Sequence, residues 1–257
     1  LETIKQYGAD ALRFTLSSMV TAGGQDLKLS EDKLGSSRNF MNKLYNVTRF
    51  FLMHPKESTA ETFADIWIQS RFMSVVEEIT PLFDKGYFGD IAAILYDFTW
   101  NEFCDWYVEM FKQGGNKEVF MKVFLGLLRL LHPFVPFITE ELWNRLDHSQ
   151  ADQSPTIMLS AWPVFQKEFI KKDIEKKMKI YIDVIRSVRN LRAEMNVAAS
   201  KQADIIIVSA DKNVLSALKD GMNYLKVLGR VHKVDLMETL AFKPREAATA
   251  VLPGIEI

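Results

Sequence analysis

The sequence predicts a mainly α-helical protein that is followed by a small α/β part. Apolar residues recur at three- and four-residue intervals through nearly all of residues 2–201, which is the helical period. The β-branched run 203–208 then changes the pattern to that of a strand. With 257 residues, 48% of them hydrophobic, the chain is long enough to bury a substantial core.

The helical part contains several separate helices. Residues 2–20 predict one or two short helices, followed by a turn at Gly23-Gly24-Gln25-Asp26 and a short extended segment at 27–29. Ser30 followed by two acidic residues is a good helix start, because its hydroxyl and the acids complement free N–H groups. The long helix that begins there ends near His54-Pro55. Further helices are predicted over residues 63–85, 88–113, 116–132 and 137–147, the last two separated by prolines.

The C-terminal part begins with a basic helix. A loop containing two prolines precedes this helix, which we place at about 166–196. Residues 203–208 then predict a strand, 213–228 a helical segment, and 231–236 and 249–257 further strands. We therefore divide the chain into residues 1–35, 36–165 and 166–257.

Composition excludes several classes of protein. Cys104 is the only cysteine, so disulfide frameworks and cysteine-based zinc sites are excluded, and four histidines without H-E-x-x-H spacing make a metal site unexpected. The longest apolar run, 123–137, is interrupted by charged and proline residues and is too short to cross a bilayer. No signal peptide is visible, so we expect a cytoplasmic protein that binds no membrane. Because the first residue is Leu, we expect a piece of a longer protein.

Charge is unevenly distributed along the chain. The net charge of −1 argues against a general binder of DNA or RNA, but residues 167–201 are strongly basic. The predicted basic helix carries a series of arginines and lysines that includes Lys171, Lys172, Lys176, Lys177, Lys179, Arg186, Arg189 and Arg192. Such faces are usually plain solvated surface, but local basic stripes also suit a shaped polyanion that is held at a few places.

The long helix carries an aromatic residue outside its core face. One stripe at 100° per residue is apolar and is predicted to be buried: Phe40, Leu44, Val47 and Phe51. A second stripe, roughly a quarter to a third of a turn away, consists of Asn39, Lys43, Asn46 and Phe50. Arg38, Asn42 and Arg49 flank it. An aromatic ring among amides and cations suits the stacking and reading of an unpaired base, although Phe50 could instead cover a neighbouring helix.

A second helix shows a similar misfit. Over residues 96–111 the predicted core face is Tyr96, Thr99, Phe103, Trp106, Tyr107 and Met110. The opposite stripe is polar except for one aliphatic residue: Asn101, Asp105, Val108 and Lys112. If the two helices pack side by side, Phe50 and Val108 form the two walls of a slot for a flat group. Two unrelated exposed apolar residues would give the same pattern.

Catalytic motifs are absent from the sequence. There is no glycine-rich phosphate loop, no G-x-S-x-G and no spacing that suggests a Ser/His/Asp triad. We interpret His132 as a structural residue and Cys104 as a buried, inert thiol. The residues themselves therefore predict binding rather than catalysis.

Several segments resemble a known enzyme family. Tyr7-Gly8-Ala9-Asp10-Ala11-Leu12-Arg13-Phe14 resembles the segment that follows the KMSKS loop of class I aminoacyl-tRNA synthetases of the Val/Ile/Leu/Met group. The long helix resembles that of the valyl-tRNA synthetases in particular, in Arg38-Asn39-Phe40, Asn42-Lys43-Leu44-Tyr45-Asn46 and Arg49-Phe50. Three further segments resemble the same synthetases: Gly23-Gly24-Gln25-Asp26, Glu102-Phe103-Cys104-Asp105-Trp106-Tyr107 and Leu131-His132-Pro133-Phe134-Val135-Pro136-Phe137. The resemblance reaches Leu252-Pro253-Gly254 and is densest in residues 1–145.

The resemblance implies a class I synthetase anticodon-binding helical bundle, preceded by a stem-contact segment (1–35) and followed by the basic helix and the small α/β part. It implies that the catalytic, editing and coiled-coil domains lie outside this chain. The full-length enzyme would be an ATP-dependent valine-specific ligase needing magnesium. This chain would hold no cofactor, would be inactive alone, and would bind tRNA(Val), not DNA, as a monomer.

The resemblance also assigns site residues. In this family the middle anticodon base, an adenine, lies between an aromatic and an aliphatic side chain, at the positions of Phe50 and Val108. Lys43 belongs to the same base-reading patch, in which we expect Asn39, Asn42 and Asn46 to bind base edges or phosphates and Arg38 and Arg49 to neutralise backbone. Weaker backbone contacts are expected from Lys33, Arg186 and Arg189. An Arg of a related enzyme aligns with Asp32, so Lys33 or Arg38 is expected to replace it at the third base.

Two alternative interpretations remain open. The first is the same region of an isoleucyl-tRNA synthetase, whose long helix usually lacks the Asn-Lys-Leu-Tyr-Asn block present here. The second is a helical protein-interaction scaffold without an RNA role. Within the patch, the three asparagines could also be plain surface amides or could form hydrogen bonds between helices.

Overall fold

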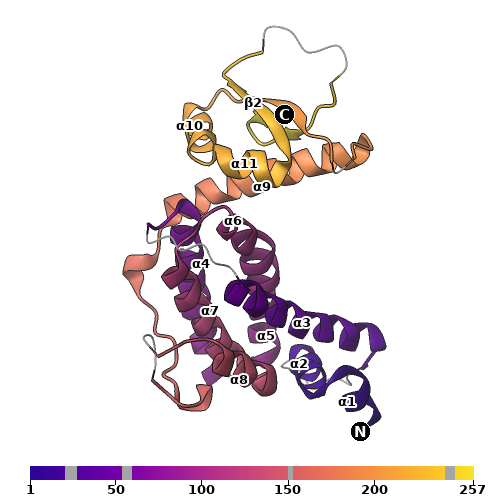
Figure 1. Ribbon diagram of the computed structural model, residues 1–257, viewed down its shortest axis with the longest axis vertical. Helices are drawn as coiled ribbons and strands as arrows, with labels where there is room; N and C mark the ends of the chain where they lie inside the picture. The colour runs from indigo at the N-terminus through magenta and orange to yellow at the C-terminus, as the bar shows by residue number, and fades with distance from the viewer. Residues whose placement is uncertain (21–27, 54–59, 150–152, 199, 241–246) are drawn as a thin grey trace. The chain divides into compact units, whose positions relative to one another are not determined.

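The computed structural model describes residues 1–20, 28–53, 60–149, 153–198, 200–240 and 247–257 (Figure 1). The chain forms two compact units, Leu1–Ile170 and Lys171–Ile257, which are described separately here. The predicted turn Gly23-Gly24-Gln25-Asp26 and the dipeptide His54-Pro55 lie outside the described residues.

The first unit is helical, as predicted. Its elements are α1 (Glu2–Tyr7), α2 (Ala9–Met19), α3 (Glu31–Met53), α4 (Phe63–Asp84), α5 (Phe88–Asp97), the π-helix η1 (Phe98–Tyr107), α6 (Val108–Phe111), α7 (Lys117–Leu131), α8 (Pro136–Arg145) and the 3-10 turns η2 (Ile157–Leu159) and η3 (Lys167–Phe169). Ser30 starts α3 as expected, since the Lys33 N–H donates to its hydroxyl at 3.4 Å. The predicted extended segment at 27–29 is wrong over its described part, because Lys28 and Leu29 belong to no strand.

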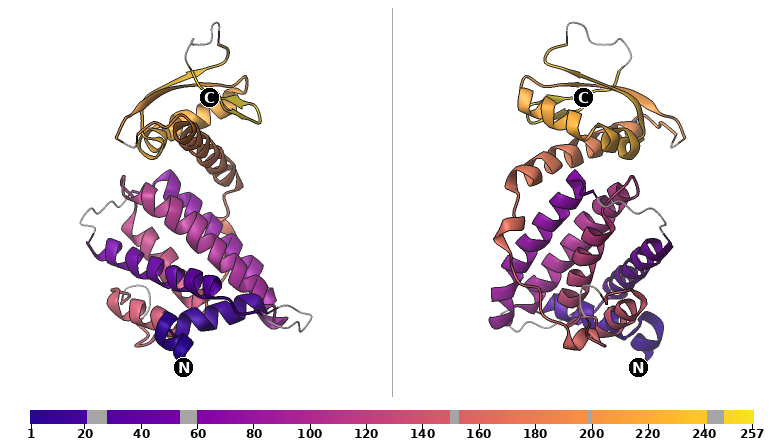
Figure 2. Two further views of the ribbon diagram at one scale, coloured as in Figure 1. Left: turned by 90° about the vertical axis from the view of Figure 1, so that its right-hand side faces the viewer. Right: turned by 60° about the vertical axis from the view of Figure 1, so that its left-hand side comes forward.

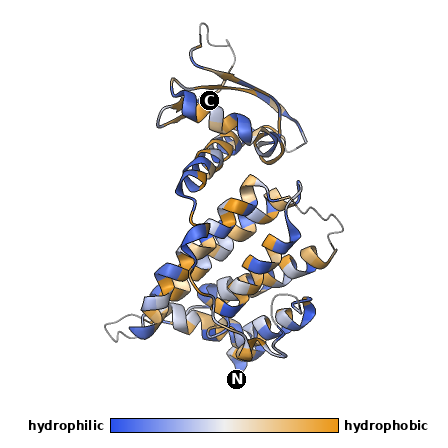
Figure 3. Cartoon of the chain, turned by 90° about the vertical axis from the view of Figure 1, so that its left-hand side faces the viewer, coloured by the Kyte–Doolittle hydropathy of each residue, from blue (hydrophilic) through white to orange (hydrophobic). Residues whose placement is uncertain are grey.

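The core of the first unit is rich in aromatic rings. The α3 residue Phe51 stacks on Phe120 of α7 with ring centroids 4.7 Å apart. Phe103 of η1 stacks on Phe124 of α7 at 5.6 Å. Each fully buried side chain of this kind contributes about 1.5–3 kcal/mol. Figure 3 shows the helices coloured in both orange and blue, as expected for helices with one buried face.

A buried carboxylate joins three helices of this core. Asp65, which is fully buried, caps the start of α4 together with Thr62. Its Oδ1 accepts a hydrogen bond of 2.7 Å from the Tyr107 hydroxyl at the end of η1, and its Oδ2 accepts one of 3.0 Å from the Asn116 N–H before α7. These bonds fix the point at which η1 continues into α6.

Two of the segments that resemble the synthetases meet in the fold. Asp10 of α2 accepts hydrogen bonds from the Ile138 and Phe137 N–H groups of α8, at 2.6 and 3.3 Å. Arg13 donates to the carbonyls of Pro133 and Phe134, at 3.0 and 3.2 Å. Burial raises the pKa of Asp10, although the two N–H groups oppose that effect. Segment 7–14 is therefore docked on segment 131–137.

The second unit is a small α/β structure, also as predicted. Its elements are α9 (Lys172–Glu194), β1 (Ala203–Val208), α10 (Lys212–Asp220), α11 (Met222–Gly229), β2 (Val231–Met237), β3 (Val251–Leu252) and β4 (Ile255–Glu256). The strand order is β2-β1-β4-β3, with β1 and β2 parallel and the other pairs antiparallel. The three helices cover one face of the sheet (Figure 2). Gly221 allows close packing here, because a Cβ at that position would lie 2.4 Å from the ring of Tyr181.

No helix in the described part of the chain combines the length and the apolar character that crossing a membrane requires.

Candidate nucleic-acid interface

The two faces of α3 are arranged as the sequence predicts. Phe40, Leu44, Val47 and Phe51 are all buried. On the second stripe Asn39 and Asn46 are exposed, while Lys43 and Phe50 are half-buried. We call the surface formed by Arg38, Asn39, Asn42, Lys43, Asn46, Arg49 and Phe50 the α3 patch.

The helix η1–α6 runs beside α3 in the same direction. Phe40 lies 6.5 Å from Trp100, measured between ring centroids, and Phe50 lies 6.3 Å from Phe111. Between these two levels an ion pair joins the helices, with Lys43 Nζ 2.9 Å from Asp105 Oδ1. The predicted neighbourhood of the two helices is thus confirmed by contacts at both ends of the α3 patch.

Lys43 is held between an acid and an aromatic ring. Its Nζ lies 5.0 Å from the centroid of Trp100, which stacks on Tyr96 at 5.7 Å. Partial burial by itself lowers the pKa of Lys43, but the hydrogen bond and the charge of Asp105 outweigh it, so that the pKa is raised. Lys43 therefore presents a firmly charged donor beside the carboxylate acceptor of Asp105.

The ring of Phe50 contacts both an aromatic ring and a cation. Its ring meets Phe111 in a T-shaped arrangement, and Lys112 Nζ lies over the ring at 5.4 Å from the centroid. Lys112 is also paired with Glu109, at 2.6 Å. The ring is thus partly covered by the bundle and partly open to a ligand.

The expectation that Val108 is exposed is wrong, because only 5% of its surface is accessible. Residues 98–107 form a π-helix, in which each turn contains more residues than in an α-helix. A π-helix therefore turns by less than 100° per residue. Counting 100° per residue from Asn101 overestimates the rotation of the helix by the time Val108 is reached, and so predicts the wrong face for Val108. The structure places Val108 in the core, and the predicted slot with two exposed walls is not formed.

The asparagines of the α3 patch are free to bind. Asn39, Asn42 and Asn46 are exposed, and none of their side chains has a hydrogen-bond partner among the described residues. This argues against a role in joining helices. Arg49 is exposed at the Phe50 end of the patch, and the guanidinium of Arg38 lies over the Tyr7 ring at 5.7 Å from its centroid.

The weaker candidates lie on other surfaces. Lys33 and Asp32 are exposed in the first turn of α3, and Arg186 and Arg189 are exposed on α9 in the second unit. Sequence reasoning missed Asp105 and Trp100 as members of the site. The only signal for Asp105 was its position on the polar stripe of its helix, since its contact with Lys43 spans 62 residues.

The described residues offer no site for metal or nucleophilic chemistry. No group of three His, Cys, Asp or Glu side chains among them could hold a metal ion. Burial raises the pKa of the Cys104 thiol to about 12, so this cysteine is protonated and unreactive, as interpreted from the sequence.

A helical bundle with a basic, amide-rich surface around a half-exposed ring has the chemistry that suits an unpaired nucleic-acid base. Comparison with known families gives a match over residues 65–207 to the anticodon-binding domain of tRNA ligase. The chain belongs to this family.

Several relatives are similar over the whole chain, and one solved structure shares its fold. Valine–tRNA ligases of Clostridium tetani, Carboxydothermus hydrogenoformans and Geobacillus stearothermophilus are 37%, 38% and 36% identical over all of this chain. The chain spans 30–31% of the length of these relatives. The LeuRS of Agrobacterium radiobacter K84, solved as a ternary complex with tRNA and LeuAMS, has the same fold over 66% of this chain and 21% of its own, with a TM-score of 0.51 and 19% identity.

Proposed function

We propose that this chain is the anticodon-recognition region of a valine–tRNA ligase and binds tRNA(Val). The observation that carries this proposal is the α3 patch, in which a half-exposed ring, a charged lysine and three unbonded amides share one face of a helix. The similarity of the whole chain to valine–tRNA ligases supports valine over isoleucine. A scaffold for proteins would need no unpaired amides around an open ring.

Stacking on Phe50 supplies the first part of recognition. A base on an aromatic ring gains roughly 1–3 kcal/mol, whichever base it is. Because Val108 is buried, it backs the site from within the bundle rather than forming a second wall. Most of the stacking energy therefore comes from Phe50.

The pair Lys43–Asp105 supplies the second part, which is the choice of base. Its ammonium donates and its carboxylate accepts, at groups 2.9 Å apart. Adenine offers the complementary pattern on one edge, since its amino group donates next to a ring nitrogen that accepts. Guanine offers a carbonyl and a ring N–H there, which face the wrong protein groups in the orientation that suits adenine. In that orientation the pair favours adenine over guanine as the middle anticodon base.

The remaining residues of the patch bind the rest of the anticodon. Asn39, Asn42 and Asn46 hydrogen-bond base edges or phosphates, and Arg38 and Arg49 neutralise the backbone. Lys33 or Arg38 contacts the third base in place of the acidic Asp32. Arg186 and Arg189 add weaker contacts with the backbone.

Catalysis belongs to the whole protein. We propose a monomeric cytoplasmic ligase that joins valine to tRNA(Val) with ATP and magnesium. This chain contributes no catalytic group and holds no cofactor, so it is inactive by itself. Because it makes only part of the contacts of the intact enzyme, it binds tRNA with a Kd in the micromolar range or weaker, roughly −8 kcal/mol or less favourable.

A titration of the 257-residue chain tests the proposal. Three tRNAs are compared at low and moderate salt: tRNA(Val), tRNA(Val) carrying an isoleucine anticodon, and tRNA(Ile). The proposal expects a preference for the valine anticodon and an affinity that falls steeply with salt. Preference for the isoleucine anticodon would support the isoleucyl alternative, and no binding would support the scaffold. Nanomolar, salt-insensitive binding, or valine-dependent ATP–pyrophosphate exchange, would contradict the account of what the chain contains.

A further inference from the structure

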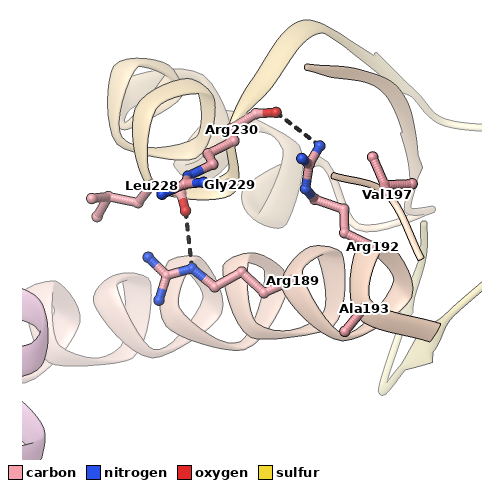
Figure 4. A pocket seen from close by; sticks show the side chains of 7 residues that line it. All are labelled: Arg189, Arg192, Ala193, Val197, Leu228, Gly229 and Arg230. Carbon is pink, nitrogen blue, oxygen red and sulfur yellow. Dashed lines mark hydrogen bonds between the residues drawn. The ribbon is translucent and has the colours of Figure 1, made fainter. Parts of the chain in front are cut away.

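The second unit contains a cavity lined by three arginines (Figure 4). It has a volume of about 360 Å³ and lies between α9 and the end of α11. The lining residues are Arg189, Arg192, Ala193, Val197, Leu228, Gly229 and Arg230. None of these seven is acidic, so no carboxylate from the described residues lines the cavity.

Arg192 provides a fixed positive charge in this cavity. It is only 9% exposed, and its guanidinium donates to three carbonyls: Arg230 at 3.2 Å, Ala198 at 3.2 Å and Lys201 at 2.5 Å. Among the described residues it forms no ion pair. Carbonyl dipoles satisfy its N–H groups but leave its net charge, which acts strongly because water is largely excluded around it.

The other two arginines are exposed beside it. Arg189 Nε donates to the Leu228 carbonyl at 2.9 Å, which holds that guanidinium at the end of α11 (Figure 4). Arg230 follows α11 directly, with a left-handed backbone at φ 53°.

We propose that this arginine cavity binds a phosphate group of an RNA backbone. The planar guanidinium matches the geometry of phosphate oxygens, and a phosphate with part of its ribose fits the volume. Among the described residues no aromatic side chain lines the cavity, so these residues offer no stacking platform and read no sequence. The inference rests on the proposed tRNA binding and deepens it, because it replaces a general backbone contact of Arg189 by a defined phosphate site with Arg192 and Arg230.

The test compares two double variants of the 257-residue chain in tRNA titrations at several salt concentrations. Arg189→Gln with Arg230→Gln removes the two exposed charges of the cavity. Lys176→Gln with Lys219→Gln removes two exposed charges of the same unit outside the cavity. The cavity variant is expected to bind every tRNA about tenfold more weakly and to reduce the salt slope by roughly one to two contacts. The control is expected to change affinity by about twofold or less, and neither variant should change the ratio between matched and swapped anticodons.

Further readouts separate the outcomes. Melting curves check the fold, and Arg230→Gln alone serves if the double variant is unstable, since it keeps the main-chain bonds of Arg189 and Arg192. Equal losses in the cavity variant and the control would overturn the proposal. A second result would also overturn it: inorganic phosphate stabilises the wild type but not the cavity variant, while the two proteins bind tRNA equally well. The site would then bind small phosphate compounds and not RNA. If the cavity variant loses affinity for tRNA and the control does not, but the wild type binds matched and swapped anticodons equally, the phosphate site is supported and the proposed function is overturned. A wild type that binds no tRNA would overturn both.

Discussion

Lys43 Nζ lies 2.9 Å from Asp105 Oδ1, so that an ion pair joins α3 to the π-helix η1 at the edge of the α3 patch. Both side chains are partly exposed, at 33% and 42%. A partly exposed ion pair contributes little to stability, typically less than about 1 kcal/mol. Because Lys43 lies on the same stripe of α3 as the half-exposed ring of Phe50, we give the pair more weight in recognition than in folding.

Asp105→Asn should weaken the choice between adenine and guanine at the middle anticodon position. The amide keeps the size of the carboxylate but can donate to the guanine carbonyl, so the preference for adenine should fall by about tenfold, which is the worth of one base contact. Binding of tRNAs that differ only at this base measures the ratio. Glu102→Gln is the matched control, since it removes a carboxylate of the same helix from an ion pair with Arg71, away from the patch. An unchanged ratio in Asp105→Asn would show that the acid does not read the base.

Phe50→Ala and Phe51→Ala should have opposite effects. Phe50→Ala should weaken tRNA binding by roughly 1–3 kcal/mol, and it should destabilise the fold less than Phe51→Ala does, because the ring of Phe50 is half-exposed. Phe51 is buried and stacked on Phe120, so its removal should cost roughly 3–5 kcal/mol of folding. Urea unfolding and tRNA titration measure the two quantities. If Phe50→Ala unfolds the protein, the ring is structural.

Asp65→Ala should destabilise the first unit strongly. The carboxylate is fully buried and accepts bonds from Thr62, Tyr107 and Asn116, so the change leaves buried donors without a partner. We expect a loss of roughly 3–5 kcal/mol in the free energy of unfolding. Asp147→Ala, at an exposed site that binds only Ser149, should change it by less than about 0.5 kcal/mol. If the two changes lowered the free energy of unfolding equally, the hydrogen bonds of Asp65 would not be what stabilises the first unit.

His132 should make stability depend on mild acid. Burial lowers its pKa below the ordinary value of 6.5, although Glu140 and Asp10 partly oppose this. The folded state therefore favours the neutral ring, so the stabilisation is complete above about pH 6.5 and is lost as the pH falls below that value toward the lower pKa of the folded state. His132→Gln should reduce the drop in Tm between about pH 7.5 and 5.5. An equal drop in the wild type and the variant would contradict the assignment.

The sequence predicted the α3 patch because α3 is one unbroken α-helix. Its 3.6-residue period holds from Phe40 to Phe51, so both stripes fall where the pattern places them. The prediction that Val108 is exposed was wrong because the same period does not hold through the π-helix that precedes this residue. Nothing in the local pattern signals a π-helix, since it depends on how the aromatic residues of η1 pack against α7.

Contacts between distant segments could not be predicted from periodicity. The pairing of Lys43 with Asp105 and the arginine cavity both depend on which helices become neighbours. The last predicted strand, 249–257, is in fact a tight hairpin of β3 and β4. Gly254 was visible as a turn signal, and its φ of 75° shows why the chain reverses there.

The most direct test of the central claim uses the anticodon alone. Isolated anticodon stem-loops of tRNA(Val) and of tRNA(Ile) are titrated into the 257-residue chain and into its Phe50→Ala variant. We expect the valine stem-loop to bind the wild type more tightly than the isoleucine stem-loop does. We expect the Phe50→Ala variant to bind the valine stem-loop with a free energy that is roughly 1–3 kcal/mol less favourable. Equal binding of the two stem-loops, or equal binding by wild type and variant, would show that the α3 patch does not read the valine anticodon.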